Sequence, residues 1–416
     1  MTDAKKLTAS LRNAPGFVRF WMASTVSDFG TYITTIALQV IVVVSHHTGA
    51  AGVGLVTAAR WLPYPLVGLV AGVLVDHARR RPLLVTTDVV RGLLLVLVPV
   101  LAWSHHLSLV VVMGFMVAFG MMSLLNDTAS QSLLPRLVPA SQLTAANARL
   151  DQSAAAAQVS GPATGGAVVS LLSAPGAVLI DAVSYFAFAV LLLRLPIDEP
   201  AARRVSLRDV RHEALEGLRW IYRHTTLRPL ALSTHGWFVC NAVAAAILPV
   251  FVLRTLGVST LGYGVVLSVS GVGALMGSLA ATRLGARFGC GRVVVTCRAA
   301  TAVAWGVMAL SPHHALGWIV LGAGQLVLGV SMGAENANEM GYWQVVTPDA
   351  LQGRMNATRR SINRAMIVIA APVGGALGDA IGYRLTLWAV AGGFLVVAIA
   401  LGASPFRNAR IGSALP

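Results

Sequence analysis

Six charged or titratable side chains lie inside long apolar stretches of the sequence, at Asp28, Arg60, Asp127, His235, Glu335 and Glu339. An ionised side chain at the centre of a bilayer costs about 2.5–3.5 kcal/mol on insertion scales, so such residues face a cavity or an oppositely charged partner. Carboxyl and imidazole groups exchange protons, and an arginine can alternate between carboxylates. Side chains of these types could therefore exchange protons with a water-filled cavity inside a membrane.

The elements that must position these residues are transmembrane helices. Of the 416 residues, 56% are hydrophobic and 11% are charged, far below the charge of a soluble domain. Apolar stretches long enough to cross about 30 Å of hydrocarbon recur along the chain. Twelve spans are predicted, at roughly 17–44, 50–75, 82–103, 107–134, 146–172, 175–195, 227–253, 259–284, 293–311, 315–346, 361–379 and 385–404.

The basic residues indicate topology. With a cytoplasmic N-terminus, the predicted external loops contain only Arg254 and Arg384 of the 31 lysines and arginines. The net charge of +15 therefore marks cytoplasmic loops and attracts anionic lipid, and it does not indicate nucleic acid. We expect a multi-pass inner (plasma) membrane protein with both termini in the cytoplasm.

Four of the six residues fall at comparable depth on spans one, four, seven and ten. At about 1.5 Å per residue, they lie roughly 12–17 Å from the cytoplasmic end. Arg60 lies about 22 Å up span two, within reach of Asp28 if those helices pack together. The alternative role for Asp127 and Glu339 is to form hydrogen bonds at a gate. The alternative for His235 is a satisfied cavity histidine, with its ring nitrogens hydrogen-bonded and no part in proton movement. Three other aspartates near span ends are expected to cap helices: Asp88, Asp181 and Asp379.

The chain repeats itself at half its length. Residues 139–148 and 348–357 share a proline and an Asn-Ala pair at an offset of 209. Pro162 and Gly165 correspond to Pro372 and Gly375 at an offset of 210, as do residues 81–87 and 291–297. This predicts halves of six helices at 1–195 and 227–416, joined by a central loop at 196–226. Residues 206–224 of that loop are expected to form an amphipathic interfacial helix or a plain linker helix.

The segment 72–81 carries a recognisable motif, with Gly72, Leu74, Asp76, Arg80 and Arg81 spaced as G-x-L-x-D-x-x-G-R-[RK]. Arg79 replaces the glycine of that pattern and His77 replaces an arginine. The motif resembles the gating loop of the major facilitator superfamily, and its branch of enterobactin and macrolide exporters in particular. "PGFVRFW", "LVPASQLTAANA", "EGLRWIYRH" and "LQGRMNA" extend this resemblance over the whole chain.

The resemblance implies an all-α membrane protein of twelve helices in two six-helix halves, the major facilitator fold. It also gives roles to residues. Asp76 and Arg79–Arg81 would make contacts between the halves that change with state, although the arginines can also serve as topology signals alone. Gly161, Pro162, Gly165 and Gly166 in "GPATGG" resemble the core of the antiporter motif, or form a packing kink. The coupling arginine common in span four is missing, and we expect Asp28 with Arg60 to replace it.

No cofactor or metal site is predicted. Cys240, Cys290 and Cys297 are scattered, and the pairs His46–His47, His105–His106 and His313–His314 lack a third ligand. We therefore expect a monomeric transporter, not an enzyme, that exports an amphipathic or hydrophobic small molecule in exchange for protons. An importer or a lysophospholipid flippase on the same fold is the alternative.

Overall fold

The computed structural model describes residues 15–45, 48–130, 133–194, 207–313 and 316–410, and in these ranges it has no strands. The first half comprises α2 (Pro15–Val40), the π-helical turn η1 (Ile41–Ser45), α3 (Ala50–Trp61), α4 (Pro63–His77), α5 (Arg80–Trp103), α6 (Leu109–Ser130), α7 (Leu134–Leu137), the turn η2 (Ala140–Gln142) and α8 (Leu143–Leu193). Then follow α9 (Leu207–Arg223), α10 (Leu227–Val250), the π-helical turn η3 (Phe251–Thr255), α11 (Thr260–Phe288), α12 (Cys290–Ala309), α13 (Leu316–Val346), α14 (Asp349–Ile381), α15 (Tyr383–Gly402) and the turn η4 (Pro405–Asn408).

The spans show local breaks. Ten helices in the described ranges are long and apolar enough to cross a membrane, so the predicted number of twelve is not matched one to one. Two features account for the difference. Pro63 begins α4 directly after α3, so that predicted span two consists of two short helices. Ser173 has left-handed backbone angles (φ 64°) and bends α8 between predicted spans five and six.

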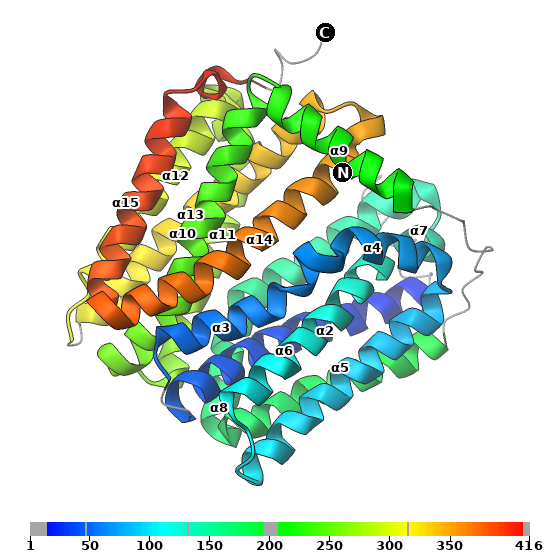
Figure 1. Ribbon diagram of the computed structural model, residues 1–416, viewed down its shortest axis with the longest axis vertical. Helices are drawn as coiled ribbons and strands as arrows, with labels where there is room; N and C mark the ends of the chain where they lie inside the picture. Colours follow the sequence, from blue (N-terminus) through cyan, green and yellow to red (C-terminus); the bar gives the residue numbers. More distant parts are fainter. Residues whose placement is uncertain (1–14, 46–47, 131–132, 195–206, 314–315, 411–416) are drawn as a thin grey trace, which may run out of the picture.

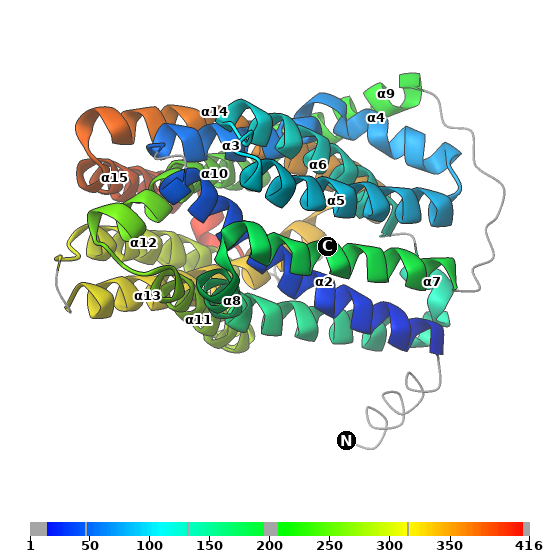
Figure 2. The ribbon, with the colours of Figure 1, turned by 90° about the horizontal axis from the view of Figure 1, so that it is seen from below.

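The two halves of the chain lie side by side. Figure 1 shows the blue-to-teal helices α2–α8 on one side and the green-to-red helices α10–α15 on the other, with α9 crossing between them at one end. The view in Figure 2 shows the helices running together in stacked layers. We call the end where α9 lies the α9 end, and the opposite end, where η1 and η3 lie, the η1 end.

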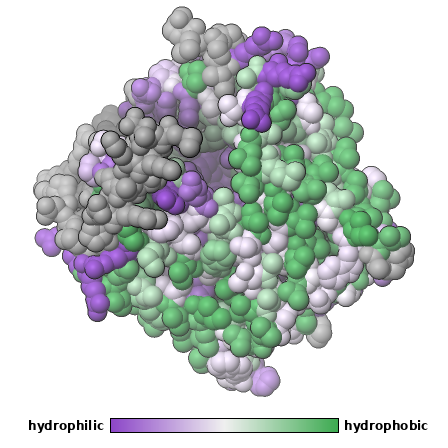
Figure 3. Space-filling view, turned by 180° about the vertical axis from the view of Figure 1, so that it is seen from behind, coloured by the Kyte–Doolittle hydropathy of each residue, from purple (hydrophilic) through white to green (hydrophobic). Residues whose placement is uncertain are grey.

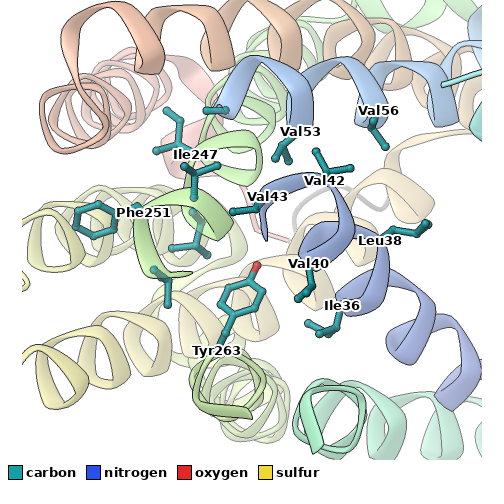
Figure 4. Packing of buried hydrophobic residues seen from close by; sticks show 14 of the residues in the cluster. Ile36, Leu38, Val40, Val42, Val43, Val53, Val56, Ile247, Phe251 and Tyr263 are labelled. Carbon is teal, nitrogen blue, oxygen red and sulfur yellow. The ribbon is translucent and has the colours of Figure 1, made fainter. Parts of the chain in front are cut away.

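The η1 end is closed by apolar packing between the halves. Side chains of α2, η1 and α3 contact those of α10, η3 and α11 in one buried cluster, which includes Val42, Val53, Ile247 and Phe251 (Figure 4). Burying apolar surface contributes about 25 cal/mol per Å², so this cluster favours closure of that end.

Polar contacts reinforce the closed end. Arg254 of η3 donates a hydrogen bond to the Val43 carbonyl in η1. The Tyr263 hydroxyl donates to Gln39 Oε1 at 3.1 Å. Asp379 of α14 accepts hydrogen bonds from the backbone N–H groups of Ala50 and Ala51 at 2.8 and 2.9 Å. The capping prediction for Asp379 is thus confirmed, and the helix it caps is α3 of the other half.

Candidate substrate cavity and its charged cluster

A cavity of about 980 Å³ lies between the halves. Helices α2 and α8 supply one wall, and helices α10–α14 supply the other. Asp151 and Asn356, two turns from the starts of α8 and α14, line it toward the α9 end. Figure 3 shows hydrophilic side chains in a hollow on one face of the molecule, whose surface is otherwise largely hydrophobic. The cavity therefore approaches the α9 end, while the η1 end is sealed.

Arg298 is the central charged residue of the cavity wall. It lies on α12 and is completely buried. Its Nη2 atom pairs with Glu335 Oε1 at 3.0 Å and with Glu339 Oε2 at 2.9 Å, both on α13. The same guanidinium donates to Ser233 Oγ at 2.7 Å and Thr234 Oγ1 at 3.1 Å on α10. One arginine therefore joins three helices around two carboxylates.

The two glutamates have different surroundings. Glu339 Oε1 accepts hydrogen bonds from Thr234 at 3.0 Å, from Trp343 at 3.3 Å and from Arg359 at 3.3 Å. Glu335 has Arg298 as its ion-pair partner, and its Oε2 atom is buried without a hydrogen-bond partner in the described residues. Glu339 is thus hydrogen-bonded through both oxygens, whereas Glu335 has one buried oxygen without a partner there.

His235 lies behind the cavity wall in a chain of hydrogen bonds. Its Nδ1 is 2.7 Å from Asn363 Oδ1 on α14, and its Nε2 is 2.7 Å from the Tyr222 hydroxyl on α9. Asn363 itself lines the cavity. Both ring nitrogens are satisfied, which agrees with the alternative reading of His235 as a satisfied histidine, and the chain connects α9 to the cavity.

The first-half residues lie apart from this cluster. Asp28 is half-buried, one turn before the cavity residue Tyr32, and no ion pair joins it to Arg60 in the described ranges. The Arg60 guanidinium lies 5.8 Å from the ring centre of Phe119 on α6 instead. The expected Asp28–Arg60 pair is therefore absent, because α3 packs against α6 and α14. Asp127 is exposed and accepts a hydrogen bond from Tyr64 at 2.9 Å.

The structure gives partial information on the gating loop. The backbone of Gly72 and Asp76 belongs to α4, but their side-chain surroundings lie outside the described residues. Arg79 is exposed between α4 and α5, and Arg80 and Arg81 begin α5 with partly buried side chains. The roles of these five residues stay predictions.

The "GPATGG" segment lies at a contact between helices. A Cβ on Gly161 would come within 2.6 Å of the Tyr32 ring, and one on Gly165 within 3.1 Å of the Tyr32 carbonyl oxygen. A Cβ on Gly166 would come within 2.8 Å of the Thr260 carbonyl oxygen on α11. Pro162 lies at the same crossing, since a Cβ on Gly264 of α11 would come within 2.3 Å of its carbonyl oxygen. These residues bring α8 close to α2 and, across the halves, to α11.

The first half contains a buried charged cluster that the sequence reasoning missed. Asp88 and Arg91 of α5 form a buried ion pair, and Asn126 of α6 donates to Asp88 Oδ1 at 3.2 Å. Arg91 also lies 4.5 Å from the ring centre of Tyr185. The capping prediction for Asp88 is wrong, because it lies inside the helix and pairs with Arg91. The capping prediction for Asp181 is also wrong, because this buried residue accepts a hydrogen bond from Thr34 at 2.6 Å.

Arg298 was missed for a related reason. It lies within predicted span nine, five residues from its start, and was not among the candidate residues. A usable signal existed, since Glu335 and Glu339 lie one turn apart on the next span and require positive charge. No group of three histidine, cysteine or acidic residues suited to a metal ion occurs in the part of the chain that the structure describes.

Comparison with known proteins agrees with this architecture. Residues 8–412 match the model of the transmembrane secretion effector family. The chain is 25% identical to the multidrug efflux pump Tap of Mycolicibacterium fortuitum, over 88% of this chain and 90% of that protein. It is 27% identical to the uncharacterised transporter y4rN of the major facilitator type from Sinorhizobium fredii, over 88% and 89% of the two chains.

Solved structures show the same fold. The nucleoside transporter NupG superimposes with a TM-score of 0.76 at 12% identity, covering 94% of this chain and 98% of that one. An inward-facing bacterial homologue of the iron transporter ferroportin gives a TM-score of 0.75 at 14% identity, covering 93% and 97%. The chain therefore belongs to the transmembrane secretion effector family, within the major facilitator superfamily of membrane transporters, and is not an enzyme.

Proposed function

We propose that this transporter exports an amphipathic or hydrophobic small molecule from the cytoplasm in exchange for protons, by alternating access. The observation that carries the proposal is the Arg298–Glu335–Glu339 cluster on the wall of a cavity that is closed at one end. Buried charge of this kind is expensive in a membrane and marks ion pathways. The similarity to the efflux pump Tap supports the outward direction.

The orientation follows from charge. Helices α4 and α14 contact α9, Arg79, Arg80 and Arg81 follow α4 in the chain, and basic segments stay in the cytoplasm. With the α9 end inside, the cavity faces the cytoplasm and the η1 end closes the external side. We expect a plasma-membrane monomer with both termini in the cytoplasm.

Glu335 is the proposed proton carrier. Its side chain lines the cavity and its buried Oε2 atom has no hydrogen-bond partner in the described residues, whereas Glu339 accepts hydrogen bonds on both oxygens. A proton on Glu335 removes one negative charge from a cluster in which Arg298 and Arg359 balance two carboxylates. Arg298 and Arg359 then share Glu339, so protonation gives the cluster one net positive charge and loss of the proton restores the balance.

The coupling follows from access. When the cavity opens outward, external water can deliver a proton to Glu335. When it opens inward, the proton leaves to the cytoplasm and the substrate enters. Differential affinity of the two states for proton and substrate then drives the exchange. Asp28 ranks second as a carrier, because it lacks an arginine partner in the described residues.

The test uses proteoliposomes that contain the purified protein and an entrapped pH dye, with dansylglycine, an amphipathic small molecule, as the transported probe. Glu335→Gln should abolish pH-driven dansylglycine transport and keep dansylglycine counterflow, because exchange needs only a loaded carrier that changes state. Asp349→Asn, an exposed acidic residue outside the cavity, is the matched control.

Several outcomes would contradict the proposal. Normal pH-driven transport by Glu335→Gln would remove this carrier, and loss in Asp28→Asn alone would assign the role to Asp28. If wild-type protein moves the probe in the same direction as protons, from the external to the cytoplasmic side, an importer is favoured. Movement of labelled lysophospholipid in place of dansylglycine would favour a flippase.

A further inference from the structure

The cavity has arginines that its own carboxylates do not neutralise. Arg298 and Arg359 are engaged with Glu335 and Glu339. Two further arginines of α14 line the cavity without an ion pair in the described residues, namely Arg360 and Arg364. The remaining cavity carboxylate, Asp151, is exposed on α8 in the opposite wall and is likewise without an ion pair there.

Arg360 and Arg364 are one helical turn apart on α14. Residues at this spacing lie on the same face with their Cβ atoms about 5–6 Å apart, and like charges placed so repel each other. A bound anion between them would relieve this repulsion and accept hydrogen bonds from both. The spacing therefore favours a ligand with a carboxylate, phosphate or sulfonate group.

Arg364 is held in position by a stacking contact. Its guanidinium carbon lies 3.7 Å from the ring centre of Trp61, on α3 of the other half. Stacking uses the face of the guanidinium and leaves the N–H groups at its edge free. Its Nε atom is buried and lacks a hydrogen-bond partner in the described residues. This guanidinium therefore has unused donors in a fixed orientation.

A second, deeper pocket receives the rest of the ligand. It measures about 270 Å³ and shares Tyr32, Gln158 and Gly271 with the main cavity. Its polar side chains are uncharged and include the amides of Gln39, Asn241 and Gln325, and its apolar walls include Trp305 and Leu267. No charged residue lines it, so an apolar or neutral polar body fits there and a second charged group does not.

We infer that the transported molecule is an amphipathic organic anion. Its anionic group binds Arg360 and Arg364, and its uncharged, partly apolar body enters the deeper pocket between Tyr32 and Trp305. The inference rests on the proposed transport function, of which it specifies the substrate class. A free solute is meant, not the headgroup of an anionic lipid, because the deeper pocket is small compared with two acyl chains.

The test is equilibrium binding without any gradient, so that its result does not depend on proton coupling. Three probes share one fluorophore and differ in charge: dansylglycine (anionic), dansylamide (neutral) and dansylcadaverine (cationic). The protein is held in phosphatidylcholine nanodiscs. We expect dansylglycine to bind about tenfold more tightly than dansylamide, as one charge-assisted contact provides, and dansylcadaverine to bind most weakly.

Variants assign the effect to the arginines. Arg360→Gln and Arg364→Gln should each weaken dansylglycine binding by about tenfold and leave dansylamide binding unchanged. Arg364→Lys keeps the charge and should recover part of the loss. Arg407→Gln, which removes an exposed arginine of η4 outside the cavity, is the matched control. Thermal unfolding of each variant shows whether it is folded.

Three outcomes would overturn the inference. These are tightest binding of dansylcadaverine, an equal effect of the arginine variants on all three probes, and loss of dansylglycine binding when the nanodisc lipid is phosphatidylglycerol. The last result would assign the site to lipid headgroups. If dansylglycine binds as expected but no proton exchange occurs, the substrate class holds and the coupling proposal fails.

Discussion

The two halves of the protein each bury a charged cluster, and the clusters differ in their access to the cavity. In the first half, Asp88 and Arg91 pair within one helix, and neither residue lines the cavity. In the second half, Arg298 joins Glu335 and Glu339 across helices, and all three residues line it. The charged cluster of the first half is therefore separated from the cavity, whereas that of the second half lines it.

The two clusters show which property separates a structural from a functional buried ion pair. The cost of burial forces both clusters to pair, so pairing alone does not separate structure from function. Contact with the cavity does separate them, because protons and substrate can reach only a cluster that lines the cavity. Duplication at an offset of 210 aligns Asp88 with Arg298. The same position in the two halves thus carries opposite charges and, we propose, different roles.

The largest expected effect is that of Arg298→Met. It leaves two carboxylates at the cavity wall without their shared cation, and breaking a buried pair costs about 3–5 kcal/mol. We expect a large drop in melting temperature in detergent and no pH-driven transport. A triple variant that adds Glu335→Gln and Glu339→Gln should recover stability and stay inactive. Transport by the triple variant would show that the second-half cluster is only structural.

Asp76→Asn sharpens the comparison at the loops. The first half has this aspartate in its gating motif, while the corresponding loop of the second half carries Arg283, Arg287 and Arg292 without one. We expect transport to fall by about tenfold, as the loss of one charge-assisted contact would produce, with normal membrane insertion. Wild-type rates in reconstituted protein would contradict the gating role.

The closed cluster of the first half should be replaceable. Arg91→Met and Asp88→Leu should each destabilise the protein by about 3–5 kcal/mol, because each leaves one buried charge without its partner. The double variant removes both charges and should regain most of that stability, with transport within about twofold of wild type. Melting temperatures and transport rates measure the two effects. Loss of coupled transport in a stable double variant would break the distinction between the clusters.

The smallest effect concerns His224, at the junction of α9 and α10. Its Nδ1 faces the backbone N–H groups of Thr226 and Leu227 at 3.3 and 3.4 Å, so it accepts hydrogen bonds in its neutral form. Burial lowers the pKa of His224 below its usual 6.5. The unfolded junction thus binds a proton more readily than the folded one. The contribution of His224 to the stability of the folded junction is therefore fully present above pH 6.5 and is lost as the pH falls below that value.

Hydrogen exchange of residues 224–230 should therefore be faster at pH 5.5 than at pH 7.5, after correction for the intrinsic pH dependence of exchange. His224→Asn should remove the pH dependence while keeping an acceptor near the start of α10. Equal protection at both pH values in wild-type protein would contradict the assignment.

The sequence predicts much of the fold because hydropathy and loop charge act locally. The break at Ser173 falls between predicted spans five and six, and α9 falls within the predicted central loop. The partners of the charged residues depend on tertiary packing instead. Arg60 lies near Phe119 because of how α3 meets α6, and no pattern within either helix records that contact. Glu335 and Glu339 were identified, but their shared partner required knowing that α12 adjoins α13.

The contact of α8 with α11 has a consequence for mutational surveys. A Cβ on Gly264 would lie 2.3 Å from the Pro162 carbonyl oxygen, and one on Gly271 would lie 2.5 Å from that of Gln158. Main chain meets main chain at this crossing. In a screen of all substitutions, these glycines would be as intolerant as the proton carrier, although they have no side chain that could exchange a proton. Positions that accept no substitution, although they carry no reactive side chain, would then mark the surface on which one half moves over the other.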